Sequence, residues 1–291
     1  MQLIRSHGLG NDYLVLESGE TMTPQWVQAL CDRHSGVGGD GVLEPFETER
    51  GDYGVRIWNP DGSVAEKSGN GLRIFARWLV DERGAPSRFT VWTGSCLVGC
   101  EVDGDALAVE MGQATFVPAE VPVLGEAPLL DAPLKVGIET LPVIAVGVGN
   151  PHCVVFEDLS LDELPWRTWG PLIEHHEWFP RRTNVQFARV LDARTVEIRI
   201  WERGAGETSA SGSSSCGVAA AGVRTGRLKP GRITVQMPGG TLWVTVREDY
   251  SLRLEGPVQV IGRVEVHPDW LLHWEHAHRA NSSSRSPHGG E

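Results

Sequence analysis

The sequence has no long apolar run, few cysteines and no excess of basic residues. No apolar run reaches the ~18 residues that a membrane-spanning helix needs, and the opening stretch MQLIRSHGLGND has no apolar signal core. We therefore expect a cytoplasmic protein that does not enter a membrane. The formal net charge is -12, from 26 basic and 38 acidic residues. Because phosphate backbones repel such a chain, we expect no nucleic-acid partner.

The cysteines follow no disulfide or metal-binding pattern. Their number is odd, and a chain of 291 residues is long enough to bury its own core, which argues against a disulfide framework. The five are Cys31, Cys96, Cys100, Cys153 and Cys216. Cys96 and Cys100 are close in sequence, but no second pair of ligands accompanies them, so chance is favoured over a zinc site. We expect no metal.

Two pairs of similar segments indicate an internal duplication. The segment VRIWNPDGSVAEKSGNG, residues 55–71, resembles IRIWERGAGETSASGSS, residues 198–214, since both place a Ser-Gly at the same distance after Arg-Ile-Trp. Upstream of each, GLGNDYLVLE from Gly8 resembles GVGNPHCVVFE from Gly147. The two pairs occur in the same order and at nearly the same separation, which favours a duplicated domain.

The patterns around these segments predict both helices and strands. After Ser68, apolar residues recur at the spacing of one helix face. They are Leu72, Phe75, Ala76, Leu79 and Val80. After Ser211, the small and apolar run CGVAAAGVRTG is typical of a buried central helix that ends at Gly226. Thr23-Pro24 is typical of the start of a third helix. Strand patterns such as SRFTVWTGS, TVEIRIW and GTLWVTVRE outnumber the helices, so we expect an α+β fold of two similar halves.

The expected halves are residues 1–117 and 118–262, with a seam near Phe116 to Pro122. The last strand of the second half is free to pack back on the first. Residues 268–291 are polar and rich in Ser and His, so we expect a disordered tail and no metal site on its histidines.

Each repeated segment ends in a polar loop where a helix is predicted to begin. Unpaired N–H groups and the positive end of the helix dipole favour a carboxylate at such a position. The donors would be those of Gly69, Asn70 and Gly71 and of Gly212, Ser213 and Ser214. A carboxylate held by both loops has its α-carbon between Ser68 and Ser211, the geometry for inverting a stereocentre. The alternative is that each serine is only an N-cap and Asn59-Pro60-Asp61-Gly62 only a turn.

Six segments in order resemble the blocks of the diaminopimelate epimerase family. They are HGLGNDYLVLE, CDRHSGVGGDGVL, IWNPDGSVAEKSGNGLRIFARWL, GNPHCVVF, RTNVQF and WERGAGETSASGSSSCGVAA. The resemblance runs from about Met1 to Gly262 and implies two pseudo-symmetric halves, each a mixed β-sheet wrapped around a central α-helix. It implies epimerisation of LL- to meso-diaminopimelate, in lysine and peptidoglycan-precursor synthesis, with no cofactor. A homodimer is compatible with it.

The resemblance also implies which residues hold a small amino-acid or dicarboxylate substrate. The matching substrate-holding residues are Asn11, Asn59, Asn150, Asn184 and Arg203. Glu202 matches the partner of the reacting ammonium, whereas Asp40 and His152 match auxiliary positions. The positions that clamp the α-carboxylate are Gly69, Asn70, Gly212 and Ser213.

The two positions that carry the chemistry depart from the family pattern. Where the family uses a pair of cysteines as base and acid, this sequence has Ser68 and Ser211. A thiol titrates near ~8.5 and an alcohol near ~15.7, a difference on the order of 10 kcal/mol. Helix dipoles contribute only ~0.3–2 kcal/mol, so a serine needs an activating group. The candidates in sequence are His7, Glu66, Lys67 and His152, and their spacing selects none of them.

Three functions remain open. The first is a weak or altered epimerase with a carboxylate base such as Asp40, Glu66 or Glu202. The second is an isomerase or lyase of the same fold with one carboxylate base, and the third is an amino-acid-binding protein without turnover. A further alternative is that the two serines are engineered replacements. Lys67 and the run Ser213-Ser214-Ser215 favour natural divergence instead. The retained polar residues favour the epimerase, since unpaired polar groups in a closed cleft are costly.

Overall fold

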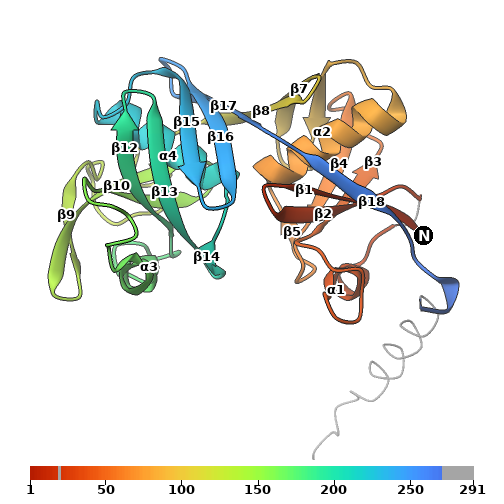
Figure 1. The fold of residues 1–291 in the computed structure, drawn as a ribbon, viewed down its shortest axis with the longest axis horizontal. Helices are drawn as coiled ribbons and strands as arrows, with labels where there is room; N and C mark the ends of the chain where they lie inside the picture. The colour runs from red at the N-terminus through yellow and green to blue at the C-terminus, as the bar shows by residue number, and fades with distance from the viewer. Residues whose placement is uncertain (19–20, 271–291) are drawn as a thin grey trace, which may run out of the picture.

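The computed structural model describes residues 1–18 and 21–270, which form two lobes joined by extended strands (Figure 1). The helices are α1 (Pro24–Cys31) and α2 (Gly69–Arg83) in the first half and α3 (Trp166–Glu174) and α4 (Gly212–Arg224) in the second. The strands of the first half are β1 (Gln2–Gly8), β2 (Asn11–Leu16), β3 (Val42–Phe46), β4 (Tyr53–Trp58), β5 (Val64–Ala65), β6 (Arg88–Trp92), β7 (Leu97–Asp103) and β8 (Ala106–Gln113). Those that follow are β9 (Ala132–Val136), β10 (Glu139–Gly147), β11 (Pro151–Phe156), β12 (Asn184–Asp192), β13 (Thr195–Glu202), β14 (Gly206–Thr208), β15 (Gly231–Met237), β16 (Gly240–Val246), β17 (Ser251–Gly256) and β18 (Gln259–Glu265).

Both halves repeat one order of strand pairing. In the first half β1–β2 is antiparallel, β2–β3 parallel, β3–β4 antiparallel and β4–β6 parallel, and β6, β7 and β8 follow as antiparallel neighbours. In the second half β10–β11 is antiparallel, β11–β12 parallel, β12–β13 antiparallel and β13–β15 parallel, and β15, β16 and β17 follow in the same way. The predicted α+β fold of two pseudo-symmetric halves is confirmed.

Within the described residues, pairings between named strands connect the halves at two places. Strand β8 pairs with β17, and β18 returns from the second half to pair with β1, both antiparallel (Figure 1). The predicted seam near Phe116 to Pro122 falls between β8 and β9. The division into 1–117 and 118–262 stays a prediction.

Helices α2 and α4 are the central helices of the two halves. The apolar face of α2 is buried, including Leu72, Phe75 and Leu79, and the helix ends at Gly84 in the left-handed conformation. Helix α4 is buried on nearly all sides, and its small residues allow β10, β11, β12 and β16 to pack against it. Gly226, with a φ of 74°, follows its last turn. Both predicted helices are therefore present where the sequence placed them.

The sequence patterns did not predict α3. It lies between β11 and β12, as α1 lies between β2 and β3, so it is the counterpart of α1 in the repeat. Helix α1 begins with the predicted cap, since Thr23 Oγ1 accepts from Trp26 N. Helix α3 has no side-chain cap at Pro165 and contains Pro171. The usual signals of a helix start are therefore missing from its sequence.

The remaining expectations concern membrane helices, metal sites and the C-terminal segment. In residues 1–18 and 21–270, no helix is both long and apolar enough to cross a membrane. Over the same ranges no three His, Cys, Asp or Glu side chains are arranged to hold a metal, and Cys96 and Cys100 are free thiols. Of the predicted tail, 268–291, residues 271–291 lie outside the described part of the chain. Trp270, at its described end, donates from Nε1 to Ser35 O at 2.9 Å.

Candidate active site

The starts of α2 and α4 carry the same cap. Ser68 Oγ accepts from Gly71 N at 3.0 Å, and Ser211 Oγ accepts from Ser214 N at 3.4 Å. Each serine is therefore an N-cap, which is the alternative to a chemical role that the sequence analysis gave. The cap role and a chemical role are compatible, because each hydroxyl oxygen has a second lone pair and a proton.

The two helix starts lie against each other in space. A side chain added at Gly69 or at Gly212 would meet Leu254 Cδ2 at 2.7 Å, and a Cβ on Gly212 would lie 3.7 Å from Gly69 Cα. Leu254 is fully buried in β17. Glycine at both positions thus allows the two helix N-termini to approach one leucine from two sides.

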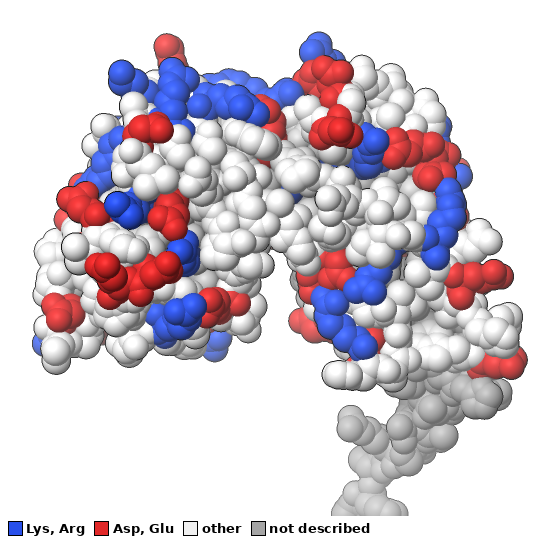
Figure 2. Space-filling view, viewed as in Figure 1, with Lys and Arg blue, Asp and Glu red and all other residues white. Residues whose placement is uncertain are grey.

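A cavity of about 570 Å³ lies in front of these helix starts and is lined by both halves. Figure 2 shows the molecule hollowed between its lobes, with mainly uncharged residues at the apex of the hollow in that view. Ten of the predicted site residues line the cavity: Asn11, Asp40, Asn59, Ser68, Asn70, Asn150, Glu202, Ser211, Gly212 and Ser213. The structure therefore brings Ser68 and Ser211 to one cavity.

The remaining predicted residues lie off the cavity wall. Gly69 packs behind it against Leu254. Asn184 is buried, donates to Pro151 O at 2.9 Å and accepts from Arg203 N at 3.0 Å. Arg203 is exposed, and its Nη1 donates to Arg181 O at 3.2 Å. In this conformation Asn184 anchors the Arg203 backbone, and the Arg203 guanidinium bonds a backbone carbonyl and does not line the cavity.

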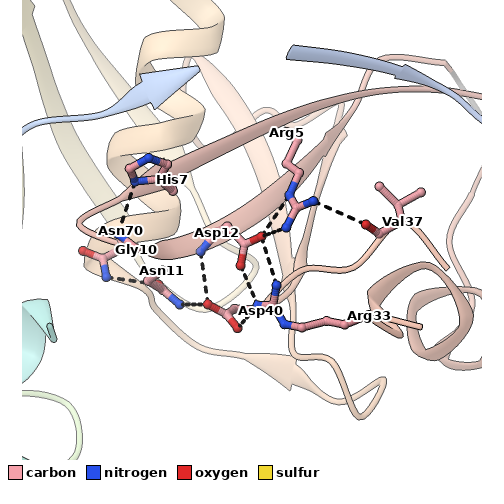
Figure 3. Close-up of polar contacts among 9 residues, drawn as sticks. All are labelled: Arg5, His7, Gly10, Asn11, Asp12, Arg33, Val37, Asp40 and Asn70. Atoms are coloured by element: carbon pink, nitrogen blue, oxygen red, sulfur yellow. Dashed lines mark hydrogen bonds and ion pairs between the residues drawn. The ribbon is translucent and has the colours of Figure 1, made fainter. Parts of the chain in front are cut away.

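A relay of polar groups supports the cavity wall in the first half (Figure 3). Buried Arg73 donates from Nη2 to Asn70 Oδ1 at 2.7 Å, Asn70 donates to Asn11 Oδ1 at 3.0 Å, and Asn11 donates to Asp40 Oδ2 at 2.8 Å. Asp40 also accepts from Asp12 N at 3.1 Å. These bonds fix the Asn70 and Asn11 side chains beside the start of α2.

Asp12 anchors the outer end of this relay. It is buried and accepts from Arg5 Nη2 at 2.6 Å and from Arg33 Nη2 at 2.7 Å, while Arg33 also donates to Asp40 Oδ1 at 2.7 Å (Figure 3). Burial by itself would raise the pKa of Asp12, but the hydrogen bonds and charges of Arg33 and Arg5 outweigh it and hold that pKa below its usual value. The carboxylate therefore stabilises the fold while it is ionised.

We expect Asp12→Asn to lower the free energy of unfolding by about 2–3 kcal/mol near pH 7, because it leaves two arginines without their shared carboxylate. Since the folded pKa is depressed, this stability is present above the ordinary aspartate pKa of ~3.9 and is lost as the pH falls through the folded value. Urea unfolding at several pH values measures both effects. Exposed Glu49→Gln is the control and should change little. Equal stability of Asp12→Asn and wild type at pH 7 would contradict the role of Asp12.

Ser68 has a neighbour that its counterpart lacks. Tyr13 Oη lies 3.1 Å from Ser68 Oγ, and both residues line the cavity. Ser211 Oγ has Ser213 Oγ at 3.4 Å instead. The sequence analysis did not single out Tyr13, although its place two residues after Asn11 in the repeated Gly-x-Gly-Asn segment was a signal.

The equivalent residue of the second half, His152, is buried behind the cavity. Its Nδ1 faces Gln186 Nε2 at 3.1 Å and its Nε2 faces Asn150 Oδ1 at 2.8 Å. Gln186 also donates to Ser214 Oγ at 3.0 Å. Burial lowers the pKa of His152 to about 3, so the ring is neutral and its donors and acceptors hold Asn150. Its ring nitrogens contact Asn150 and Gln186 rather than either serine.

Of the other groups considered for activating a serine, Lys67 lines the cavity. Its Nζ donates to Glu110 O at 2.8 Å, and burial lowers its pKa. His7 Nδ1 accepts from Gly10 N at 3.2 Å, and Glu66 is exposed and does not line the cavity. The acidic wall residues are Asp40, Glu202 and Glu207. Burial raises the pKa of Glu202 despite a hydrogen bond from Thr208, so this carboxylate is more basic than an ordinary glutamate.

Comparison with known proteins agrees with the family resemblance of the sequence and with the fold. The family model described as diaminopimelate epimerase matches residues 3–117 and 144–261. The diaminopimelate epimerase of Synechococcus elongatus is 40% identical over 269 residues, covering 88% of this chain and 95% of its own. "Diaminopimelate epimerase 2" of Nostoc sp. is 38% identical over 278 residues, covering 91% and 95%.

Solved structures of the same fold are more distant in sequence. A hydroxyproline epimerase from Agrobacterium vitis aligns with a TM-score of 0.65 at 16% identity, covering 91% of this chain and 90% of its own. A methylitaconate-delta-isomerase aligns with a TM-score of 0.62 at 12% identity, covering 93% and 97%. These likenesses concern the fold alone, whereas the family model and the curated relatives extend over most of the sequence. This chain belongs to the diaminopimelate epimerase family.

Proposed function

We propose that this protein is a cofactor-independent amino-acid epimerase that inverts the α-carbon of diaminopimelate between the LL and meso forms. The observation that carries the proposal is the meeting of two capped helix starts at one cavity, with Ser68 and Ser211 on its wall. This arrangement suits an isomerase that acts at a carbon next to a carboxylate. The carboxylate binds the two helix starts, and groups from the two halves face the α-carbon from opposite sides.

The charges on the cavity wall fit a zwitterionic amino acid. Asp40 and Glu202 supply negative charge from the two halves for ammonium groups, and the α2 and α4 N-termini supply positive potential for the α-carboxylate. Asn11, Asn59 and Asn150 add amide groups. The exposed Arg203 guanidinium is the candidate partner for a distal carboxylate, and the Gly-rich loop at 204–206 provides the freedom for it to turn inward.

Glu202 is the best-supported base in this proposal. Three donors, Asn11, Asp12 N and Arg33, already occupy the oxygens of Asp40, so that carboxylate is engaged within the protein. Glu202 has one hydrogen bond, from Thr208 Oγ1 at 3.2 Å, and a raised pKa. Glu202 and Ser211 both come from the second half, so the proton is removed on that side and must be returned from the Ser68 side.

The test is proton exchange in deuterated water. LL- and meso-diaminopimelate are incubated with the protein, and the α-proton is followed by NMR. We expect loss of the α-proton signal together with appearance of the other stereoisomer, and we expect Glu202→Gln to slow both by about 10²-fold. Glu177→Gln is the matched control, because Glu177 is exposed and does not line the cavity.

Other outcomes would assign the protein differently. Tight binding without exchange would make it a binding protein. No binding to diaminopimelate, with conversion of an unsaturated or hydroxylated acid, would favour an isomerase or lyase with Glu202 as its single base. Both outcomes would contradict the epimerase.

A further inference from the structure

The Ser68 hydroxyl lies on the cavity wall between a backbone donor and the phenol of Tyr13. Its oxygen accepts from Gly71 N at 3.0 Å and lies 3.1 Å from Tyr13 Oη. The Ser68 hydroxyl offers two lone pairs and one proton. When the phenol donates to the second lone pair, the Ser68 proton has no further acceptor within residues 1–18 and 21–270, and Ser68 lines the cavity. Tyr13, Ser68 and the ligand position then form a line of hydrogen bonds.

The Tyr13 ring is fixed in this position by its surroundings. The residue is 6% exposed and lies in β2, between β1 and β3. Gly41 packs on the ring, since a Cβ there would lie 2.7 Å from Tyr13 Cε1 and 2.2 Å from Trp58 O. A larger residue at position 41 does not fit, so the ring is held by close contact and the phenol oxygen is pre-positioned for Ser68.

The second half has no such phenol. His152 occupies the position of Tyr13 in the repeat, but its two ring nitrogens are engaged by Gln186 and Asn150. The contacts of Ser211 Oγ with Ser213 Oγ and Ser214 N are both at 3.4 Å. The two faces of the cavity are therefore chemically different, although the fold that builds them is repeated.

We propose that Tyr13 is the proton source of the Ser68 face and acts through the Ser68 hydroxyl. This inference rests on the proposed epimerase function. The α-carbanion takes the Ser68 proton and forms its new C–H bond, while Ser68 Oγ takes the Tyr13 proton. Tyr13 is left as phenolate, and the proton removed from the substrate remains on Glu202. After product release, water returns a proton to Tyr13 and accepts one from Glu202, so that charge and protons balance over the cycle.

The protonation state of Tyr13 suits a donor. Burial is the main cause that raises the pKa of Tyr13 to about 12, and the negative charges of Asp40 and Glu202 add to it, against the hydrogen bond with Ser68. The phenol is therefore neutral near pH 7 and carries its proton. Its phenolate is still more than three pKa units less basic than a serine alkoxide near ~15.7. Proton transfer from Tyr13 through Ser68 thus leaves a far more stable anion than transfer from serine alone would leave.

The experiment separates proton removal from proton return. In deuterated water, Tyr13→Phe is expected to lower inversion of diaminopimelate by at least about 10²-fold. Exchange of the α-proton without inversion should continue, because Glu202 removes and returns protons on its own face. KM should stay near the wild-type value. Ser68→Ala should uncouple exchange from inversion in the same way, and the double variant should be no slower than either single variant.

The chain contains two other tyrosines, which serve as matched controls. Tyr53 packs edge-on against Phe89 and Tyr250 against Phe116, so Tyr53→Phe and Tyr250→Phe should leave both rates unchanged. Inversion by Tyr13→Phe at the wild-type rate would overturn the inference while the epimerase function stands. Equal loss of exchange and inversion would also overturn it, since that is the result of a structural role. A wild-type protein that exchanges no α-proton would remove the epimerase function and this inference with it.

Discussion

Replacing Ser68 and Ser211 together by cysteine should raise the rate of α-proton exchange of diaminopimelate by about 10³-fold or more. The physical reason is acidity, because a thiol near ~8.5 is about seven pKa units more acidic than an alcohol near ~15.7. A proton-transfer rate responds to part of such a difference, and half of it already gives more than three orders of magnitude. At the starts of α2 and α4 the helix dipoles lower a thiol pKa further. The measurement is NMR exchange in deuterated water.

Controls separate this gain from the general reactivity of new thiols. Ser209 also lines the cavity but is exposed and lies before the α4 start, so Ser209→Cys should give no gain. Each single replacement, Ser68→Cys or Ser211→Cys, should gain less than the pair, because one face then still carries an alcohol. A double variant that binds diaminopimelate yet exchanges no faster than wild type would show that the cavity does not present the α-carbon to these two positions.

The architecture was predictable because it is repeated in the sequence. The Arg-Ile-Trp strand and Ser-Gly loop of residues 55–71 recur at 198–214, and the strand pairings recur with them. The helix α3 was missed because Pro165 and Pro171 remove the signals by which α1 was found. The repeat itself already implied a partner for α1, so comparing the two halves position by position would have found it.

The cavity was only partly predictable. Local motifs identified Asn11, Ser68 and Ser211, since each belongs to a repeated segment. The position of Arg203 off the cavity wall could not be predicted, because its side chain bonds a backbone carbonyl, that of Arg181, which no motif contains. The proximity of Tyr13 and Ser68 could not be predicted either. It depends on how β2 packs against the start of α2, and a strand pattern gives the face of a residue but not its tertiary neighbour.

Leu254 is the clearest example of a residue whose tertiary neighbours the sequence does not predict. Within the sequence it is one apolar residue of a strand pattern, SLRLEGPVQVIG, with no feature that separates it from its neighbours. In the fold its Cδ2 lies where a side chain on Gly69 or on Gly212 would be, so it determines how closely the α2 and α4 starts approach. The carboxylate site depends on this spacing, because both sets of N–H donors must reach one group.

We therefore expect Leu254→Ala to lower the free energy of unfolding by about 2–5 kcal/mol and to slow epimerisation by about 10²-fold in the protein that remains folded. Urea unfolding and NMR exchange measure the two effects. Leu134→Ala is the matched control, because Leu134 is equally buried but belongs to the separate cluster around α3. It should lose similar stability and keep its rate. Leu254→Met should cost less than about 1.5 kcal/mol and keep most of the rate. If Leu254→Ala and Leu134→Ala lost stability alike and both kept full activity, Leu254 would be an ordinary core residue and the spacing of the helix starts would have another cause.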